Sequence, residues 1–347
     1  MFEQMESNGT ERLLFACDPD NALRTIIAIH STERGPAIGG CRFIHYDSEI
    51  SAIQDAVRLA RGMSYKAALA GLPHGGAKAV ILKPSGRFNR SDLMKAFGRF
   101  VNTLKGDYIT AMDSGTQVSD MDHIRQSTQW VSCTSASGDP SPYTALGVFA
   151  GIQSAVQFQL NRENLQGIHV SIQGVGHVGY EVARLLHQAG AYLTVTDIDK
   201  KLAKRCATEF SASVVSPEEI YSVQADVFCP CGLGGILNSR TIDQLRVSII
   251  AGSANNQLES QIDGDHLYSK GILYAPDYLI NAGGLIFVAM QYAANSQSEI
   301  QQKIAGVGSA LYELFQASST SKQAVHRIAD QQAESILNPN SPLHSAA

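Results

Sequence analysis

The chain has 347 residues, of which 44% are hydrophobic and 17% are charged, and this size predicts a globular protein of about two domains. Its formal net charge is -5, with no block of Lys or Arg, which argues against a surface that binds nucleic acid or anionic membranes. The chain has no signal-like start and no run of about 18 apolar residues, so we expect a cytoplasmic protein.

The first half mixes strands and helices. Apolar and β-branched runs predict strands, and apolar residues at helical spacing predict one long helix. Asp113 follows the last of these strands, and Lys78 lies between a glycine-containing turn and another strand, where most lysines are solvated. The predicted elements are strands at 23–30, 79–82 and 107–111 and a helix at 48–69.

A loop rich in Ser, Gly and Pro at 132–142 is a candidate hinge, and a helical stretch at 143–160 follows it. Beyond it, short apolar strands alternate with segments of helix length. This alternation predicts a parallel sheet with helices on both faces. The predicted strands are 168–173, 191–197, 225–230, 247–252 and 272–276.

The segment "IQGVGHVGYEVARLL" contains Gly174, Gly176 and Gly179 in GxGxxG spacing, directly after a predicted strand. Such glycines allow a tight turn and close approach of a pyrophosphate to a helix N-terminus. Asp197 ends the next strand, near the offset of about 20 residues expected for an acid that binds the adenosine ribose. A carboxylate there repels a 2'-phosphate, so the motif favours NAD over NADP. The alternative is a packing turn with a helix-capping Asp.

Three ionisable residues of the first half, Lys66, Lys78 and Asp113, lie near the ends of predicted elements. An α-amino or α-keto acid offers a carboxylate to one cation, and chemistry at its Cα–N bond needs a proton shuttle, which a lysine can provide. Their spacing leaves open that Lys66 is a solvated helix residue and that Asp113 is a loop or cap residue.

The cysteines and histidines do not predict a metal site. The six cysteines are scattered, and Cys229-Pro-Cys231 has neither the spacing nor the second pair of a zinc site. The ten histidines include no HExxH pair. We therefore expect reduced, mostly packed thiols.

Eight segments resemble the family of amino acid dehydrogenases that act on leucine, valine and phenylalanine, relatives of glutamate dehydrogenase, and are most similar to the leucine dehydrogenases. The resemblance keeps the same order over about residues 10–335. The segments are "GPAIGGCR" (35–42), "LARGMSYKAALAGL" (59–72), "GGAKAVI" (75–81), "GRFVNTLKGDYITAMDSGT" (98–116), "SGDPSPYTALGVF" (137–149), "PCGLGGILN" (230–238), "AGSANNQL" (251–258) and "GILYAPDYLINAGGLI" (271–286).

The resemblance implies an α/β fold with a Rossmann-type doubly wound dinucleotide domain, an N-terminal α/β substrate domain and an active-site cleft between them. We expect the substrate domain at 1–134, the NAD-binding domain at 135–320 and a C-terminal helical tail at 321–347.

The resemblance also assigns roles to residues. Lys78 matches the lysine that activates water during attack on the imine, and Asp113 matches the acid that handles the amino group. Lys66 matches the lysine that binds the substrate carboxylate. The remaining matches are Gly39, Gly40 and Asn281 near the substrate, Ile38, Leu285 and Val288 along its side chain, and Thr144 and Asn255 at the cofactor.

The implied activity is NAD-dependent oxidative deamination of branched-chain L-amino acids (leucine, valine and isoleucine) to 2-keto acids and ammonia. Two alternatives remain, an aromatic amino acid dehydrogenase and a non-catalytic NAD-binding sensor; binding NAD alone would not require Lys66, Lys78 and Asp113. The expected partners are the small-molecule substrates, with no nucleic acid and no membrane, and the family suggests a homo-oligomer.

Overall fold

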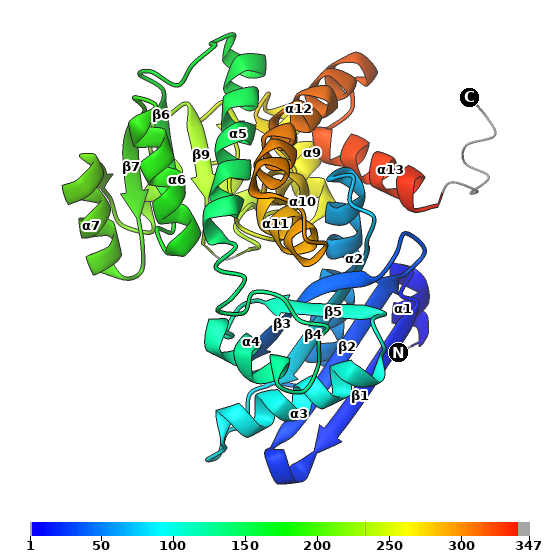
Figure 1. Ribbon diagram of the computed structural model, residues 1–347. Coiled ribbons are helices and arrows are strands. Elements are labelled where there is room, and N and C mark those ends of the chain that lie inside the picture. The colour runs from blue at the N-terminus through cyan, green and yellow to red at the C-terminus, as the bar shows by residue number, and fades with distance from the viewer. Residues whose placement is uncertain (1, 233, 339–347) are drawn as a thin grey trace. The chain divides into compact units, whose positions relative to one another are not determined.

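The computed structural model describes residues 2–232 and 234–338, so residues 339–347 of the predicted C-terminal tail lie outside the described residues. The chain forms two compact units (Figure 1). Unit 1 contains the described residues of Met1–Pro140, Val288–Asn295 and Ala333–Ala347, and unit 2 contains those of Ser141–Phe287 and Ser296–Gln332.

Unit 1 is built on a five-stranded mixed sheet with the order β1-β2-β4-β3-β5. Strand β4 lies at its centre, antiparallel to β2 and parallel to β3, and β3 in turn runs parallel to β5. The strands are β1 (Arg12–Asp18), β2 (Leu23–Ser31), β3 (Ala37–Ile44), β4 (Gly75–Leu82) and β5 (Tyr108–Met112).

A long helix, α2 (Glu49–Leu69), packs on this sheet. It begins with a capping box at Ser48, and its small apolar residues Ala52, Ala56 and Ala60 form a core with Ile26 of β2 and Val80 of β4. The other helices of the N-terminal part are α1 (Phe2–Asn8), α3 (Arg90–Thr103) and α4 (Val118–Arg125), with a short 3-10 helix at Pro19–Asn21.

Unit 2 is built on a six-stranded sheet in which every adjacent pair is parallel, with the order β11-β10-β9-β6-β7-β8. The order runs outward in both directions from the neighbours β6 and β9, which is the doubly wound arrangement predicted from the sequence. The strands are β6 (His169–Gln173), β7 (Tyr192–Thr196), β8 (Ser213–Val214), β9 (Val227–Pro230), β10 (Ile249–Ile250) and β11 (Leu273–Tyr274).

Helices follow most strands of this sheet, as the alternation in the sequence predicts. They are α5 (Ser141–Leu160), α6 (His177–Gln188), α7 (Lys200–Phe210), α8 (Ser239–Ile242), α9 (Gln261–Ser269), α10 (Asp277–Ile280) and α12 (Gln297–Ser321), with a 3-10 helix at Glu219–Ser222. Helices α11 (Gly283–Tyr292) and α13 (Val325–Leu337) contribute residues to both units. Among the described residues, none of these helices is long and apolar enough to span a membrane.

The environment of Lys78 differs from the prediction. The glycines before it do not form a turn, because β4 begins at Gly75 and Lys78 lies within the strand, opposite Ala28 of β2. Both glycines are needed for close packing: a Cβ on Gly75 would lie 1.7 Å from the Ser31 carbonyl oxygen, and one on Gly76 would lie 2.0 Å from the Ser64 nitrogen. Lys78 is therefore a core strand residue.

Candidate active site

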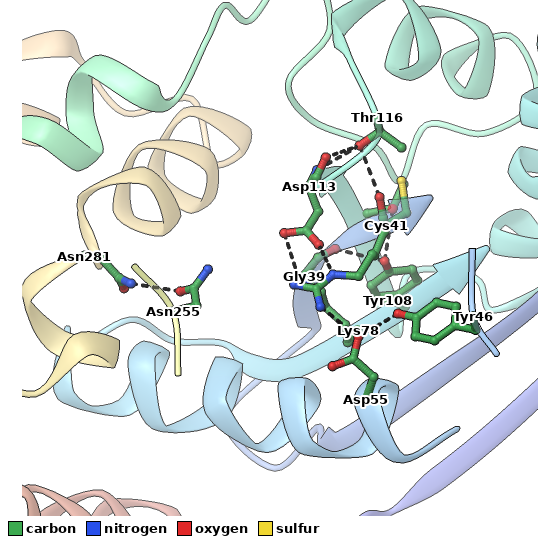
Figure 2. Close-up of polar contacts among 12 residues, drawn as sticks. Gly39, Cys41, Tyr46, Asp55, Lys78, Tyr108, Asp113, Thr116, Asn255 and Asn281 are labelled. Atoms are coloured by element: carbon green, nitrogen blue, oxygen red, sulfur yellow. Dashed lines mark hydrogen bonds and ion pairs between the residues drawn. The ribbon is translucent and has the colours of Figure 1, made fainter. Parts of the chain in front are cut away.

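The structure brings Lys78 and Asp113 together in unit 1. The Lys78 Nζ lies 3.0 Å from the Asp113 Oδ1, and the two side chains are only 5% and 15% exposed (Figure 2). A lysine this deeply buried requires a compensating charge. The solvated interpretation of Lys78 is therefore wrong, because its ammonium is held inside the unit by a carboxylate.

A short loop positions Asp113 directly after β5. The Asp113 backbone N–H donates to the Thr116 Oγ1 at 2.8 Å, and the Thr116 N–H donates back to the Asp113 carbonyl at 3.0 Å. Gly115 has a φ of +81°, and a Cβ there would lie 1.9 Å from the Phe43 carbonyl oxygen. The loop can therefore lie close against β3 only with a glycine at this point.

A second cation contacts the same carboxylate. Arg42 of β3 donates through its Nε to the Asp113 Oδ2 at 3.0 Å. Burial alone would raise the pKa of the Asp113 carboxyl, but the charges of Lys78 and Arg42 outweigh it and hold that pKa below its usual value of 3.8. Asp113 is thus a buried anion with a cation on each oxygen.

The glycines expected near the substrate lie beside this pair. A Cβ on Gly40 would come within 2.7 Å of the Asp113 Cβ, and one on Gly39 would lie 1.7 Å from the Ala77 carbonyl oxygen. The Tyr108 hydroxyl donates to the Gly39 carbonyl at 2.9 Å. These contacts explain why β3 needs glycines between β4 and β5. Ile38, the residue before them, is fully buried.

Lys66 is half-buried in the last turn of α2. This helix packs against β4, the strand that carries Lys78. Ser64 of the helix lies directly against Gly76 of the strand. Lys66 is therefore in the same unit as Lys78 and Asp113, and its role toward substrate stays a prediction.

The glycine motif of unit 2 forms the turn between β6 and α6. Gly174 has a φ of +90°, and its N–H donates to the Thr196 carbonyl at 2.8 Å. A Cβ on Gly179 would lie 2.0 Å from the Gly174 carbonyl oxygen, whereas one on Gly176 would meet nothing within 4 Å. The first and third glycines thus serve the packing of the turn, and the second leaves open space in front of the helix N-terminus.

Asp197, just after β7, is tied to the same turn. Its Oδ2 accepts from the Val175 N–H at 2.8 Å and its Oδ1 accepts from the Asp199 N–H at 2.8 Å. Each carboxylate oxygen has a further lone pair. The side chain can therefore stay fixed at the glycine turn and still accept hydrogen bonds from ribose hydroxyls.

Two amides expected at the site contact each other in unit 2. The Asn281 Nδ2 donates to the Asn255 Oδ1 at 2.8 Å (Figure 2). It also donates to the Ser253 carbonyl at 3.0 Å. The buried Asn281 Oδ1 has no hydrogen-bond partner in the described part of the chain. An unsatisfied buried acceptor is costly unless a ligand donates to it. This oxygen, the open space at Gly176 and the fixed carboxylate of Asp197 fit a dinucleotide with its nicotinamide amide.

The other expected residues lie on helices. Thr144 is half-buried in the first turn of α5. Leu285 and Val288 are 7% and 4% exposed on α11 and are three positions apart, so they lie on one face of that helix. Within the described residues, no group of three or more His, Cys, Asp and Glu side chains could hold a metal ion.

The sequence prediction missed the charged residues that support Asp113. The Arg42 Nη1 donates to the Asp55 Oδ2 at 2.7 Å, and the Tyr46 hydroxyl donates to that oxygen at 2.6 Å. The available signal was an arginine inside the apolar strand 37–44, which requires a buried carboxylate partner.

Comparisons with known proteins cover nearly the whole chain. Models of the Glu/Leu/Phe/Val dehydrogenase dimerisation domain and of glutamate/leucine/phenylalanine/valine dehydrogenase match residues 12–130 and 194–337. Leucine dehydrogenase of Geobacillus stearothermophilus is 44% identical, over 99% of this chain and 95% of its own. Phenylalanine dehydrogenase of Bacillus thermotolerans is 41% identical over 95% and 90%. The crystal structure of L-tryptophan dehydrogenase from Nostoc punctiforme superposes with a TM-score of 0.83 at 41% identity, covering 98% and 99%.

Proposed function

Since the chain belongs to the glutamate, leucine, phenylalanine and valine dehydrogenase family and is an NAD-dependent L-amino acid dehydrogenase, we propose that it oxidatively deaminates leucine, isoleucine and valine to their 2-keto acids and ammonia. The observation that carries the catalytic part of this proposal is the buried ion pair of Lys78 and Asp113, 3.0 Å apart. A protein that only binds a dinucleotide has no use for a buried lysine and carboxylate outside its dinucleotide unit.

The first proposed step is substrate binding. Lys66 neutralises the α-carboxylate, and the backbone at Gly39 and Gly40 lies along the bound amino acid. By resemblance, Asn281 is the amide that lies near the substrate and the nicotinamide. The fixed charge of Lys66 orients the substrate, which lowers the barrier mainly through positioning.

The proposed chemistry uses both members of the ion pair. Gly174, Gly176, Gly179, Asp197, Thr144 and Asn255 would hold NAD, which would supply the acceptor for the hydride that leaves Cα. Asp113 stabilises the positive charge that develops on the substrate nitrogen. Lys78 acts here as its neutral amine, which takes a proton from the water that adds to the imine carbon and returns it to the nitrogen, so that ammonia leaves and the 2-keto acid remains.

Preference for aliphatic side chains rests on Ile38, Leu285 and Val288, which are all branched and apolar. Binding in such a pocket depends on shape, and one methylene changes binding by about 1 to 3 kcal/mol. We therefore expect leucine, isoleucine and valine to be used with similar efficiency.

An aromatic substrate is the second candidate, and the comparisons favour it almost equally. The Bacillus thermotolerans and Nostoc punctiforme relatives bear the names phenylalanine and L-tryptophan dehydrogenase, at identities close to that of the leucine enzyme. Overall identity therefore does not separate the two substrate classes, and the side chain at position 285 carries the choice between them.

We further propose that residues 1–134 bind substrate, residues 135–320 bind NAD and the segment from 321 is a C-terminal tail. A homo-oligomer is proposed because the family model over residues 12–130 describes a dimerisation domain. Light scattering coupled to size exclusion measures the assembly directly. The cytoplasmic location stays a prediction.

An absorbance screen tests the proposed function. The purified protein is mixed with NAD or NADP and each L-amino acid, with D-leucine as the control, and NADH and ammonia are both measured. We expect NADH and ammonia in equal amounts with L-leucine, L-isoleucine and L-valine. A protein that binds NADH but turns over no amino acid would instead support the sensor alternative.

A further inference from the structure

A chain of buried charges extends from the proposed catalytic pair through β3 to α2. Arg42 contacts Asp113 through its Nε at 3.0 Å and Asp55 through its Nη1 at 2.7 Å. Asp55 also accepts from the Tyr46 hydroxyl at 2.6 Å and from the Arg58 Nη2 at 3.2 Å. Figure 2 shows Asp55 and Tyr46 at one end of this chain of contacts and Asp113 at the other.

The two carboxylate contacts of Arg42 require a guanidinium group. Its two carboxylate partners use different nitrogens of the same planar group, an arrangement that the single ammonium of a lysine cannot reproduce. The side chains of Arg42, Asp55 and Asp113 are 16%, 12% and 15% exposed, so little solvent screens these contacts. With Lys78, the buried set contains two cations and two anions and is internally neutral.

We propose that Arg42 is a positioning residue of the dehydrogenase. Its guanidinium fixes the orientation and the negative charge of Asp113, so that the Asp113 Oδ1 faces Lys78. Asp55, itself held by Tyr46, keeps the guanidinium in place. This inference rests on the proposed roles of Lys78 and Asp113. It adds a residue that acts through Asp113 and touches neither substrate nor cofactor.

The surroundings of Asp113 support this role. The titratable and charged groups that face it are Lys78 from β4, Arg42 and Cys41 from β3, and Tyr108 from β5. Burial raises the pKa of Cys41 to about 12 and raises that of Tyr108 well above its usual value, so both groups are neutral at the pH of the reaction. Lys78 and Arg42 are therefore the charges that keep Asp113 ionised, and Arg42 occupies the oxygen that Lys78 does not.

The test compares Arg42→Met with Arg42→Lys in the full-length enzyme. Arg42→Met removes a cation from the cluster, so protonation of the remaining groups becomes more favourable. The acid limb of the pH profile of kcat/KM should therefore move to higher pH by about one unit. Its kcat should fall by about tenfold or more, with KM for leucine and NADH affinity little changed. Arg42→Lys keeps the charge and should leave the acid limb in place while restoring only part of kcat.

Two further variants test the direction in which the acid limb of the pH profile moves. Asp55→Asn removes an anion from the same cluster, so its acid limb should move the opposite way, to lower pH; it also serves as the test if Arg42→Met does not fold. Arg58→Met is the matched control, because Arg58 contacts the same Asp55 but is 65% exposed, and it should leave the profile unchanged.

The results distinguish a failure of the role of Arg42 from a failure of the proposed function. Arg42→Met with a lower kcat but an unmoved acid limb shows a packing role and overturns the proposal, as does an Asp55→Asn limb that stays in place or moves to higher pH. Asp113→Asn is assayed in parallel. If it retains wild-type kcat, the proposed role of Asp113 fails; if it is inactive while Arg42→Met behaves as wild type, only the role of Arg42 fails. A wild-type enzyme that turns over no L-amino acid would instead refute the proposed function itself.

Discussion

Replacing Lys78 with alanine probes the proposed chemistry directly. The side chain is 5% exposed and its ammonium lies 3.0 Å from Asp113, so the substitution removes both a proton carrier and one partner of a buried ion pair. Loss of an acid–base group lowers kcat by about 100- to 10,000-fold, which corresponds to about 2.7 to 5.5 kcal/mol of activation free energy. NADH affinity should stay near wild type, because Lys78 belongs to the other unit from the glycine turn.

The same substitution has a predictable cost in stability. Breaking a buried pair destabilises by about 3 to 5 kcal/mol, and Asp113 keeps Arg42, so we expect the lower end of that range. Steady-state rates, NADH fluorescence titration and thermal unfolding give the three quantities separately. Lys83→Ala is the control, because Lys83 is exposed just after the same strand. A folded Lys78→Ala enzyme with wild-type turnover would refute the assignment.

Four further predictions address the cofactor, the substrate and the ion pair. Gly179→Ala should destabilise the fold, since its Cβ would lie 2.0 Å from a carbonyl oxygen. Gly176→Ala places its Cβ in open space, so it should leave the thermal unfolding temperature nearly unchanged but weaken NADH binding. Equal effects of the two substitutions on thermal unfolding would contradict this prediction. Asp197→Ser combined with a nearby arginine should raise kcat/KM for NADP relative to NAD, and a wild type that already prefers NADP would show that the motif is misinterpreted. Leu285→Ala should raise the ratio of kcat/KM for phenylalanine over leucine, because it enlarges the pocket; an unchanged ratio would mean that Leu285 is only helix core. The pKa of Asp113 in the folded protein lies below 3.8, so its ionised form stabilises the fold above pH 3.8. The loss of unfolding free energy caused by Asp113→Asn should therefore be largest above pH 3.8 and shrink as the pH falls further. A loss that grows on acidification would contradict the ion pair.

Unit 2 was largely predictable from the sequence, because each of its signals is local. The apolar strands, the glycine turn and Asp197 follow one another within short segments, and the parallel order follows from their alternation with helices. Strands β10 and β11 were predicted too long, since they pair over only two residues each, and the two-residue strand β8 was missed.

Unit 1 was less predictable, because its sheet depends on contacts between distant segments. Strands β1 and β3 were missed, and the glycines before Lys78 suggested a turn although they allow β4 to pack closely against its neighbours. The pairing of Lys78 with Asp113 was expected only by resemblance, and spacing along the chain gives no sign of their 3.0 Å contact. Arg42 and Asp55 were overlooked for the same reason, since an arginine in a strand has no visible partner until the helix packs beside it.

The most direct test of the central claim is the ratio of kcat/KM for NAD-dependent oxidation of L-leucine to that for L-phenylalanine and L-tryptophan in the wild-type enzyme. The account predicts that leucine is preferred over both aromatic amino acids, with valine and isoleucine close to leucine. A wild type that oxidises phenylalanine or tryptophan more efficiently than leucine would contradict the branched-chain assignment.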